Sequence, residues 1–236
     1  MMITMNRIHA LLTVQSVVVV LVSINRLSTL ALGYVAPNQF LRWVDFNNML
    51  ILPLISLVAF YLLKEQLEYD SPARQVRWHL ALNLAFLVGV YLLGASYGDH
   101  EVTNYLHSRF CPDGGTDIFC QIVIFNDDEF SHWVFFAGFV LVNSALMLLQ
   151  VVFPHRGKLT PLDTTLVVIN GLFIAAGIFA NLAFEVIGLD LYVVALLAVL
   201  SLGLLWRHGT QPLFLYYSTA YIIGLIGTAI YKAFSA

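Results

Sequence analysis

Charged residues are scarce in this chain, and their scarcity excludes most soluble folds. Asp, Glu, Lys and Arg make up 11% of its 236 residues while 60% are hydrophobic, whereas soluble domains carry about 25% charged residues. A lipid bilayer accommodates that apolar excess and water does not. The net charge is −3, so the chain has no excess of basic residues to form the surface that nucleic acids require. Any activity therefore resides inside a membrane bundle or on its loops.

Two specific features are also missing. No small-residue cleavage site follows the apolar run at residues 8–24, so we expect that run to remain as a first span rather than to be removed as a signal peptide. The last apolar run carries Lys232 only at its end and no lysine in its middle. A retinal Schiff base in the usual rhodopsin position is therefore not supported.

The chain does have seven apolar runs of the length that crosses a bilayer. They lie at residues 8–32, 43–63, 76–97, 130–153, 162–184, 189–206 and 212–234. No repeat, linker or low-complexity tract divides them. We predict an all-α, polytopic membrane helical bundle of about seven transmembrane helices, forming one domain over residues 1–236.

Basic residues are divided unevenly between the two sides of such a bundle. The N-terminal side has Arg7, Lys64, Arg74, Arg77, Arg156, Lys158 and Arg207, and the opposite side has Arg26, Arg42, Arg109 and Lys232. Because cytoplasmic loops retain Lys and Arg, we expect a cytoplasmic N-terminus and an outside C-terminus, in a plasma or inner membrane.

The only two cysteines, Cys111 and Cys120, fall in the loop between the third and fourth spans. The expected orientation places this loop outside the cytoplasm, where disulfides persist. A Pro-Asp-Gly-Gly turn sequence follows Cys111 and lets the chain fold back. We predict a Cys111–Cys120 disulfide, with a pair of free thiols as the alternative.

The segment at residues 98–129, expected to be extracytoplasmic, contains many of the chain's histidines and acidic residues. If residues 99–110 are helical, then His100, Asn104 and His107 share one face and Glu101 lies beside them. The other side of that helix is largely apolar, so the segment is amphipathic. It is expected to lie at the membrane surface or to continue the third span.

The entrance of the fourth span adds a second group of polar residues. Asp128 and Glu129 precede His132 by four and three residues, which is the spacing with which helical bundles aim a carboxylate and an imidazole at one ion. Three adjacent acids at residues 127–129 repel one another unless a cation is bound. The alternative is a solvated acidic turn that caps a helix N-terminus.

These side chains predict a metal site facing the non-cytoplasmic side. Zinc is favoured because it accepts three protein ligands and an open position for water, and iron or copper also suits mixed nitrogen and oxygen ligands. Glu101, Asp128 and Glu129 are the candidates to accept the proton of a metal-bound water. The candidate ligands are His100, His107, His132, Glu101, Asp128, Glu129 and, at the end of the fifth span, Glu185.

Seven spans with histidines and acids at one face resemble the intramembrane ceramidases and adiponectin-receptor hydrolases, although residues 211–236 lack the paired histidines of their last span. A second resemblance is to the C subunit of copper membrane monooxygenases. It rests, with different spacings, on Asp127, Phe130, His132, Trp133, Asn181 and Glu185. The first resemblance implies lipid hydrolysis and the second implies oxidation.

We therefore expect a metal-dependent integral membrane enzyme that acts at the outer leaflet on a lipid or other apolar substrate, with zinc-dependent hydrolysis as the leading reaction. One alternative is an iron- or copper-dependent oxidoreductase subunit. Another is a non-catalytic transporter or a structural subunit, whose partners are other membrane proteins or a second copy of the chain. A transporter should carry ionisable groups near mid-membrane, and this sequence has few.

Overall fold

The fold is a bundle of long helices. The computed structural model describes residues 5–69, 77–112, 114–184 and 188–235, and seven helical runs within them are long and apolar enough to cross a membrane. The predicted all-α, polytopic bundle is confirmed, and its apolar helices support an integral, multi-pass membrane protein. The runs are α1 (Met5–Leu27), Trp43–Glu68, α4 (Arg77–Phe110), Ile118–Val152, α7 (Pro161–Phe184), α8 (Leu189–His208) and α9 (Pro212–Ser235).

Two of the runs are composite. The second comprises α2 (Trp43–Phe46), the π-helical turn η1 (Asn47–Ile51) and α3 (Leu52–Glu68). The fourth comprises α5 (Ile118–Phe125), the π-helical turn η3 (Asn126–Phe130) and α6 (Ser131–Val152). The predicted start of the fourth span at residue 130 was therefore too late, because the acidic residues before it stay helical and α5 is itself apolar.

The two π-helical turns have the same hydrogen-bond pattern. The Ser131 N–H donates to the carbonyl of Asn126, and the Leu52 N–H donates to the carbonyl of Asn47, in each case five residues earlier. Pro53 follows η1 and has no N–H to continue an α-helical ladder through that turn. Single π-helical turns inside α-helices frequently occur at functional sites, and both of these contact α4.

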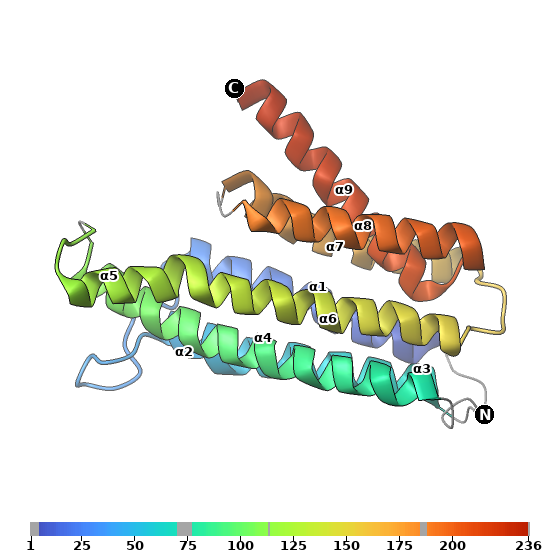
Figure 1. Ribbon diagram of the computed structural model, residues 1–236, viewed down its shortest axis with the longest axis horizontal. Helices are drawn as coiled ribbons and strands as arrows, with labels where there is room; N and C mark the ends of the chain where they lie inside the picture. Colours follow the sequence, from blue (N-terminus) through green and yellow to red (C-terminus); the bar gives the residue numbers. More distant parts are fainter. Residues whose placement is uncertain (1–4, 70–76, 113, 185–187, 236) are drawn as a thin grey trace.

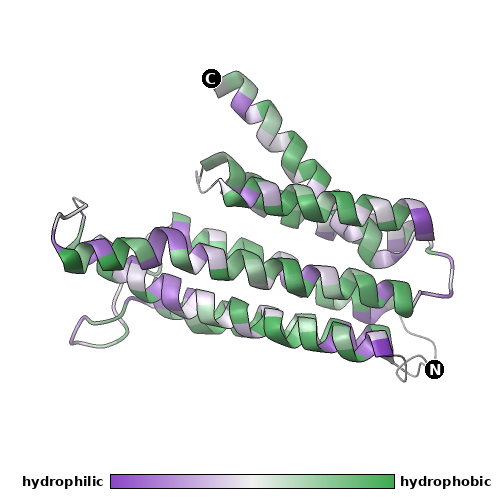
Figure 2. Cartoon of the chain, viewed as in Figure 1, coloured by the Kyte–Doolittle hydropathy of each residue, from purple (hydrophilic) through white to green (hydrophobic). Residues whose placement is uncertain are grey.

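The helices form two groups that lie side by side (Figure 1). In one group α4 runs alongside the α5–η3–α6 run, with α1 and α3 beside them. In the other group α7, α8 and α9 pack together, and the C-terminal half of α9 stays against α7, where Tyr231 contacts Phe179 and Phe184. Hydrophilic residues gather toward one end of α4 and of the α5–η3–α6 run, away from the apolar stretches (Figure 2).

The α4 helix is much longer than a bilayer requires. Its 34 residues span about 51 Å at the usual rise per residue, whereas the hydrocarbon layer is about 30 Å thick. Residues 99–110 continue the helix of the third span, which is one of the two arrangements that the sequence left open. The α4–α5 end therefore extends past the level where α1, α7 and α8 end (Figure 1).

Two glycines allow α4 and α6 to approach each other closely. A Cβ atom on Gly138 of α6 would lie 2.9 Å from the carbonyl oxygen of Gly89, and a Cβ atom on Gly89 of α4 would lie 2.8 Å from the side chain of Val142. Neither position has room for a side chain, since real Cβ contacts are not this short. Small residues at such crossings let membrane helices pack backbone to backbone.

We predict that Gly138→Ala destabilises the protein by about 1–3 kcal/mol, the usual effect of overpacking a tight contact. The control is Gly203→Ala in α8, where a Cβ meets nothing within 4 Å; it should be neutral or slightly stabilising, because alanine favours a helix. Thermal unfolding in detergent measures both. Equal melting temperatures for the two variants would contradict the close approach of α4 and α6.

Candidate metal centre

A buried carboxylate, Asp127 in η3, is the centre of the polar cluster. Its Oδ1 lies 2.9 Å from His100 Nδ1 and its Oδ2 lies 2.8 Å from His107 Nδ1. Asn104 Nδ2 approaches Oδ2 at 3.4 Å. The two imidazoles and the amide come from successive turns of α4, which present them on one face as the sequence predicted. Asp127 is 1% exposed, so these donors replace the water that an ionised carboxylate needs.

The local sequence explains why Asp127 points inward. The wider turn of η3 changes which side chains face α4 relative to a regular α-helix. The Ser131 hydroxyl then donates to the Asp127 carbonyl at 2.7 Å, and the Ser96 hydroxyl donates from α4 to the Ser131 carbonyl at 2.8 Å. These two bonds fix the turn against α4 and hold the carboxylate toward the histidines.

A second carboxylate, that of Asp128, completes a group of three side chains that could hold a metal ion. Asp128 Oδ1 lies 4.0 Å from His107 Nδ1, and one ligand atom each from His107, Asp127 and Asp128 all lie within 4.8 Å of one another. Tetrahedral bonds of about 2.1 Å place ligand atoms about 3.4 Å apart, so small side-chain adjustments suffice. The Asp128 side chain is 57% exposed, which leaves it free to move and the adjoining position open to water.

His132 lies beside this set. Its ring centroid is 4.9 Å from that of His100, and its Nδ1 is 3.0 Å from the Asp128 carbonyl oxygen one turn earlier. For that contact to be a hydrogen bond, Nδ1 carries the proton and donates. The Nε2 lone pair is then free, which is the tautomer that metal-binding histidines usually adopt.

An arginine borders the histidines on the side of α1. Arg26 Nη2 donates to Glu101 Oε1 at 2.6 Å and lies 3.4 Å from His100 Nε2. Glu101 is buried, so this ion pair supplies the charge that the carboxylate needs. The cation also occupies the Nε2 side of His100, which favours the His107 side for a bound metal ion.

A second ion pair fastens the residues that follow α1 to the same region. Arg42 donates to both carboxylate oxygens of the buried Asp45, at 2.7 and 2.8 Å, and the hydrogen bond from Arg42 to Asp45 raises the pKa of the guanidinium. The Arg42 guanidinium also lies 5.1 Å from the Tyr105 ring centroid. The Tyr105 hydroxyl donates to the Gln39 carbonyl at 2.8 Å, so α4 is tied to the segment between α1 and α2.

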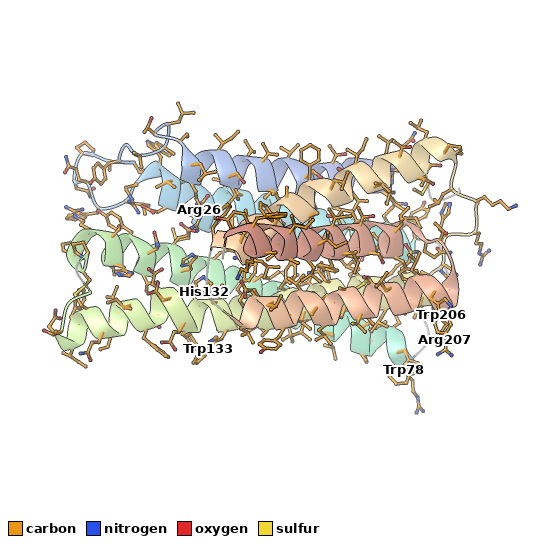
Figure 3. All side chains as sticks on the ribbon, turned by 90° about the horizontal axis from the view of Figure 1, so that it is seen from above. Arg26, Trp78, His132, Trp133, Trp206 and Arg207 are labelled. Atoms are coloured by element: carbon orange, nitrogen blue, oxygen red, sulfur yellow. A yellow bond between two sulfur atoms is a disulfide. The ribbon has the colours of Figure 1, made fainter. Side chains whose placement is uncertain are left out.

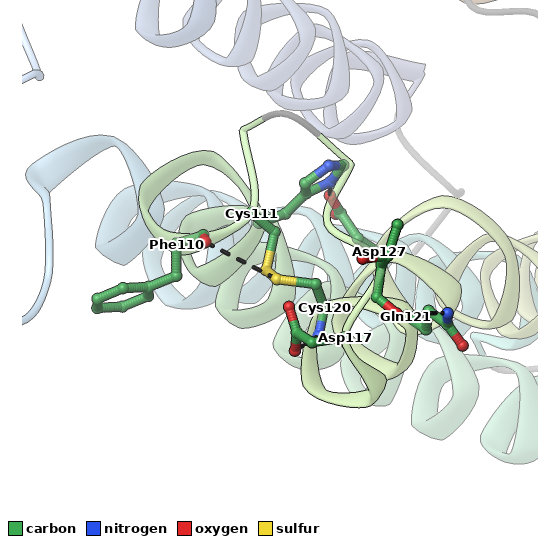
Figure 4. Close-up of a disulfide and its surroundings, with 8 residues drawn as sticks. Phe110, Cys111, Asp117, Cys120, Gln121 and Asp127 are labelled. Carbon is green, nitrogen blue, oxygen red and sulfur yellow. Dashed lines mark hydrogen bonds and ion pairs between the residues drawn. A yellow bond between two sulfur atoms is a disulfide. The ribbon is translucent and has the colours of Figure 1, made fainter.

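The Cys111–Cys120 disulfide is present, with the two Cα atoms 5.6 Å apart. It closes the turn between α4 and α5 near Asp127 (Figure 4). Asp117 caps α5 by accepting from the Cys120 N–H at 3.1 Å. The closed turn keeps the ends of α4 and α5 together, and thereby keeps His107 opposite η3.

The cluster lies at the level where the shorter helices end. His100 is 23 residues beyond Arg77 at the start of α4, which corresponds to about 35 Å and matches the length of α1. Figure 3 shows Arg26, His132 and Trp133 toward one end of the molecule, and Trp78, Trp206 and Arg207 toward the other. Tryptophans favour the membrane–water boundary, and the cluster lies on one such level.

The predicted site residues divide into three groups. His100, His107 and Asp128 converge around Asp127, and His132 lies against His100. Glu101 is turned to Arg26, and Glu129 is exposed and not part of the group that could hold an ion. The proposed ligand Glu185 lies outside the described residues.

Sequence reasoning missed two residues at the centre of the site. Asp127 was recognised as one of three adjacent acids and in the resemblance to copper monooxygenases, but not as a ligand, because α-helical spacing selects Asp128 and the wider η3 turn cannot be read from spacing. Arg26 was counted only as a basic residue near a span end. The position of Arg26, next to Asn25 and near the end of a span, could have indicated a role in the site, because a charged residue there needs a partner.

Comparison with known proteins adds no relatives to this description: no family model, curated protein or solved structure matches the chain. The function is therefore inferred from the cluster's own geometry.

We predict that Arg26→Ala is more damaging than Glu101→Gln. The first leaves a carboxylate, with a side chain only 3% exposed, without its cation, whereas the second leaves an arginine that is 38% exposed and can reach water. Removing one partner of a fully buried pair costs about 3–5 kcal/mol, and we expect about 2–3 for Arg26→Ala because water screens the arginine.

The Arg26→Ala/Glu101→Gln double variant should recover much of the lost stability, because it contains no unpaired charge. Thermal unfolding of all three variants measures the coupling. Additive effects of the two substitutions would contradict the pair.

Proposed function

We propose that this chain is a metal-dependent membrane enzyme whose divalent ion, with zinc favoured, is held by His107, Asp127 and Asp128 at the outer membrane surface. The observation that carries the proposal is the buried Asp127 carboxylate, which is contacted by two imidazoles and has a second, movable carboxylate within reach. One nitrogen and two oxygen ligands suit zinc and also suit iron.

The surroundings of the three ligands support a reactive centre over a purely structural one. Structural zinc sites are closed by four protein ligands, whereas catalytic sites keep a position for water. Here three groups each offer a ligand atom within 4.8 Å of the others, and the third group, Asp128, is largely exposed. His100 also contacts Asp127, so it can orient the carboxylate from the side opposite His107.

The level of the cluster supports a lipid or other apolar substrate. The side chains lie where the bilayer boundary meets the helices, and the same helices are apolar along the rest of their length. A substrate dissolved in the outer leaflet can therefore present a polar linkage to the cluster without leaving the membrane. A bound zinc ion would supply an activated water at neutral pH and polarise the linkage.

The contacts of the three candidate acids indicate which of them can accept the proton of a metal-bound water. Glu101 is paired with Arg26, and Asp128 belongs to the proposed ligand set. Glu129 is exposed, and among the contacts of the described residues it belongs to neither the ion pair nor the proposed ligand set. We assign the role of general base to Glu129, with Asp128 as a ligand.

Metal binding is the first test. After removal of metal with a chelator, the purified chain should take up about one zinc ion, and losing a ligand in His107→Ala or Asp127→Asn should weaken binding by at least about 100-fold. The control is His208→Ala, which removes an exposed histidine at the other end of the bundle. Calorimetry and elemental analysis provide the readouts, and selective retention of iron or copper over zinc would favour the oxidative alternative.

Equal zinc affinity in wild type, His107→Ala and His208→Ala would refute the metal centre. Acid should weaken zinc binding, because protons compete with the metal for imidazole and carboxylate ligands. The same titration repeated at lower pH measures this effect.

Activity is the second test. Hydrolysis of lipid esters and amides by protein reconstituted in liposomes should stop on chelation and return with zinc. Glu129→Gln should lower kcat by about 10²–10⁴-fold, as loss of a general base does, while zinc affinity is kept. Asp128→Asn should lower zinc affinity itself. An unchanged kcat in Glu129→Gln would show that Glu129 is not the general base.

A further inference from the structure

A groove of about 250 Å³ lies between the end of α1, the residues that follow it and η1. Leu21 and Ile24 of α1 and Ile51 of η1 form an apolar wall. Asn25, Ser28 and Asn47 form its polar part. Apolar and polar lining in one groove matches a molecule that has an apolar chain and a polar end.

The asparagines hold one another in place. Asn25 Nδ2 donates to the Val44 carbonyl at 3.1 Å and to Asn48 Oδ1 at 2.8 Å. Asn47 Nδ2 reaches Asn25 Oδ1 at 3.5 Å, which is a long contact for a hydrogen bond. The η1 turn places Asn47 and Asn48 next to each other on this side of the helix.

Hydrogen-bonding capacity is left over in this group. Asn48 does not line the groove: it is 3% exposed, its Oδ1 accepts from Asn25, and its Nδ2 has no partner among the residues that the structure describes. Asn47 is half-buried, and within the same described ranges its side-chain oxygen Oδ1 accepts no hydrogen bond, while its Nδ2 makes only the long contact to Asn25. Amide groups at a membrane boundary are stabilised by a polar partner, and a lipid linkage provides one.

The depth and charge of the groove limit what it can bind. Asn25 lies in the last turn of α1, and the end of a spanning helix meets the interfacial layer of a bilayer, which contains the neutral linkages of lipids. No charged side chain lines the groove in the described part of the chain. The neighbouring cations are paired, Arg26 with Glu101 and Arg42 with Asp45.

We infer that this groove binds a membrane lipid through its neutral linkage. The ester, amide or hydroxyl group of the lipid hydrogen-bonds to the side chains of Asn47 and Asn25. The attached acyl chain lies along Leu21, Ile24 and Ile51. The site is separate from the histidine–aspartate cluster and needs no metal. If the proposed function holds, the groove places a bound lipid close to the candidate metal centre, because Asn25 is next to Arg26 in the sequence and Arg26 contacts His100.

The same helix pair offers a matched control. A second groove of about 290 Å³ lies further along α1 and α3, beside Val14 and Ile55, and its lining is entirely apolar. Between the two grooves, Gln15 and Ser56 exchange hydrogen bonds of 2.8 and 2.7 Å. The grooves therefore differ in polarity far more than in size or in the helices that form them.

The experiment uses the full chain in nanodiscs of phosphatidylcholine that carries a photoactivatable diazirine in one acyl chain. After illumination, mass spectrometry maps the labelled residues. We expect labelling at residues 21–28 and 47–52 to exceed labelling at residues 11–14 and 54–62 by about fivefold, the ratio expected for one additional hydrogen bond.

Asn47→Leu, which removes the polar group, and Ile51→Trp, which fills the groove, should each reduce labelling of the polar groove by a similar factor. Ile51 is 41% exposed, so the tryptophan tests the site even if Asn47→Leu fails to fold. Ile55→Trp, which fills the apolar groove, should leave labelling of the polar groove unchanged.

Equal labelling of the two grooves would overturn the inference. So would labelling that persists in Ile51→Trp, or cross-linking of the groove to a second copy of the chain in place of lipid. His107→Ala should leave the labelling unchanged, so a failed metal centre and a failed lipid groove give different results.

Discussion

The α4–α5 end of this bundle depends on one contact, in which the buried carboxylate of Asp127 lies between His100 and His107. The carboxylate comes from η3 and the imidazoles from two turns of α4, so the contact joins the two longest helical runs. A buried anion is stable only with such donors. The serine bonds behind η3 and the disulfide beyond it hold the same two runs together.

Polar groups form a distinct layer at the α4–α5 end of this protein. The two π-helical turns, the asparagine group, both arginine–carboxylate pairs and the histidines His100, His107 and His132 lie there, whereas His9 with Asp163 and Lys64 with Glu68 form ion pairs at the opposite end. Each π-helical turn brings a side chain inward that a regular helix would place elsewhere: Asp127 in η3 and Asn48 in η1. The bundle thus combines an apolar body, which suits lipid, with a polar layer at its boundary that can carry chemistry.

Much of the fold could be predicted from the sequence because span length and apolar runs obey simple physical limits. The shared face of His100, Asn104 and His107 followed from helical periodicity, but that pattern left open whether residues 99–110 continue the third span or lie at the membrane surface. The end of α1 was predicted too late, at residue 32 rather than Leu27, because the Ser28 hydroxyl accepts from the Leu30 N–H and competes with the helix.

The site itself could be predicted only in part. Spacing identified the histidines, but the partner of Glu101 comes from α1, 75 residues away in the chain, and no local pattern reveals a contact at that separation. The choice of Asp127 over its acidic neighbours depends on the turn geometry of η3. That geometry is set by packing against α4, which a linear pattern does not contain.

The contact of Gly89 with Gly138 has a mechanical consequence for the site. Because their backbones touch at these glycines and the Cys111–Cys120 disulfide lies beyond the site, we expect α4 and α6 to move together, so that the candidate ligands on them keep a fixed separation. We expect an opening that admits a bulky molecule to form instead between α1 and α4, which are joined there by the ion pair of Arg26 with Glu101.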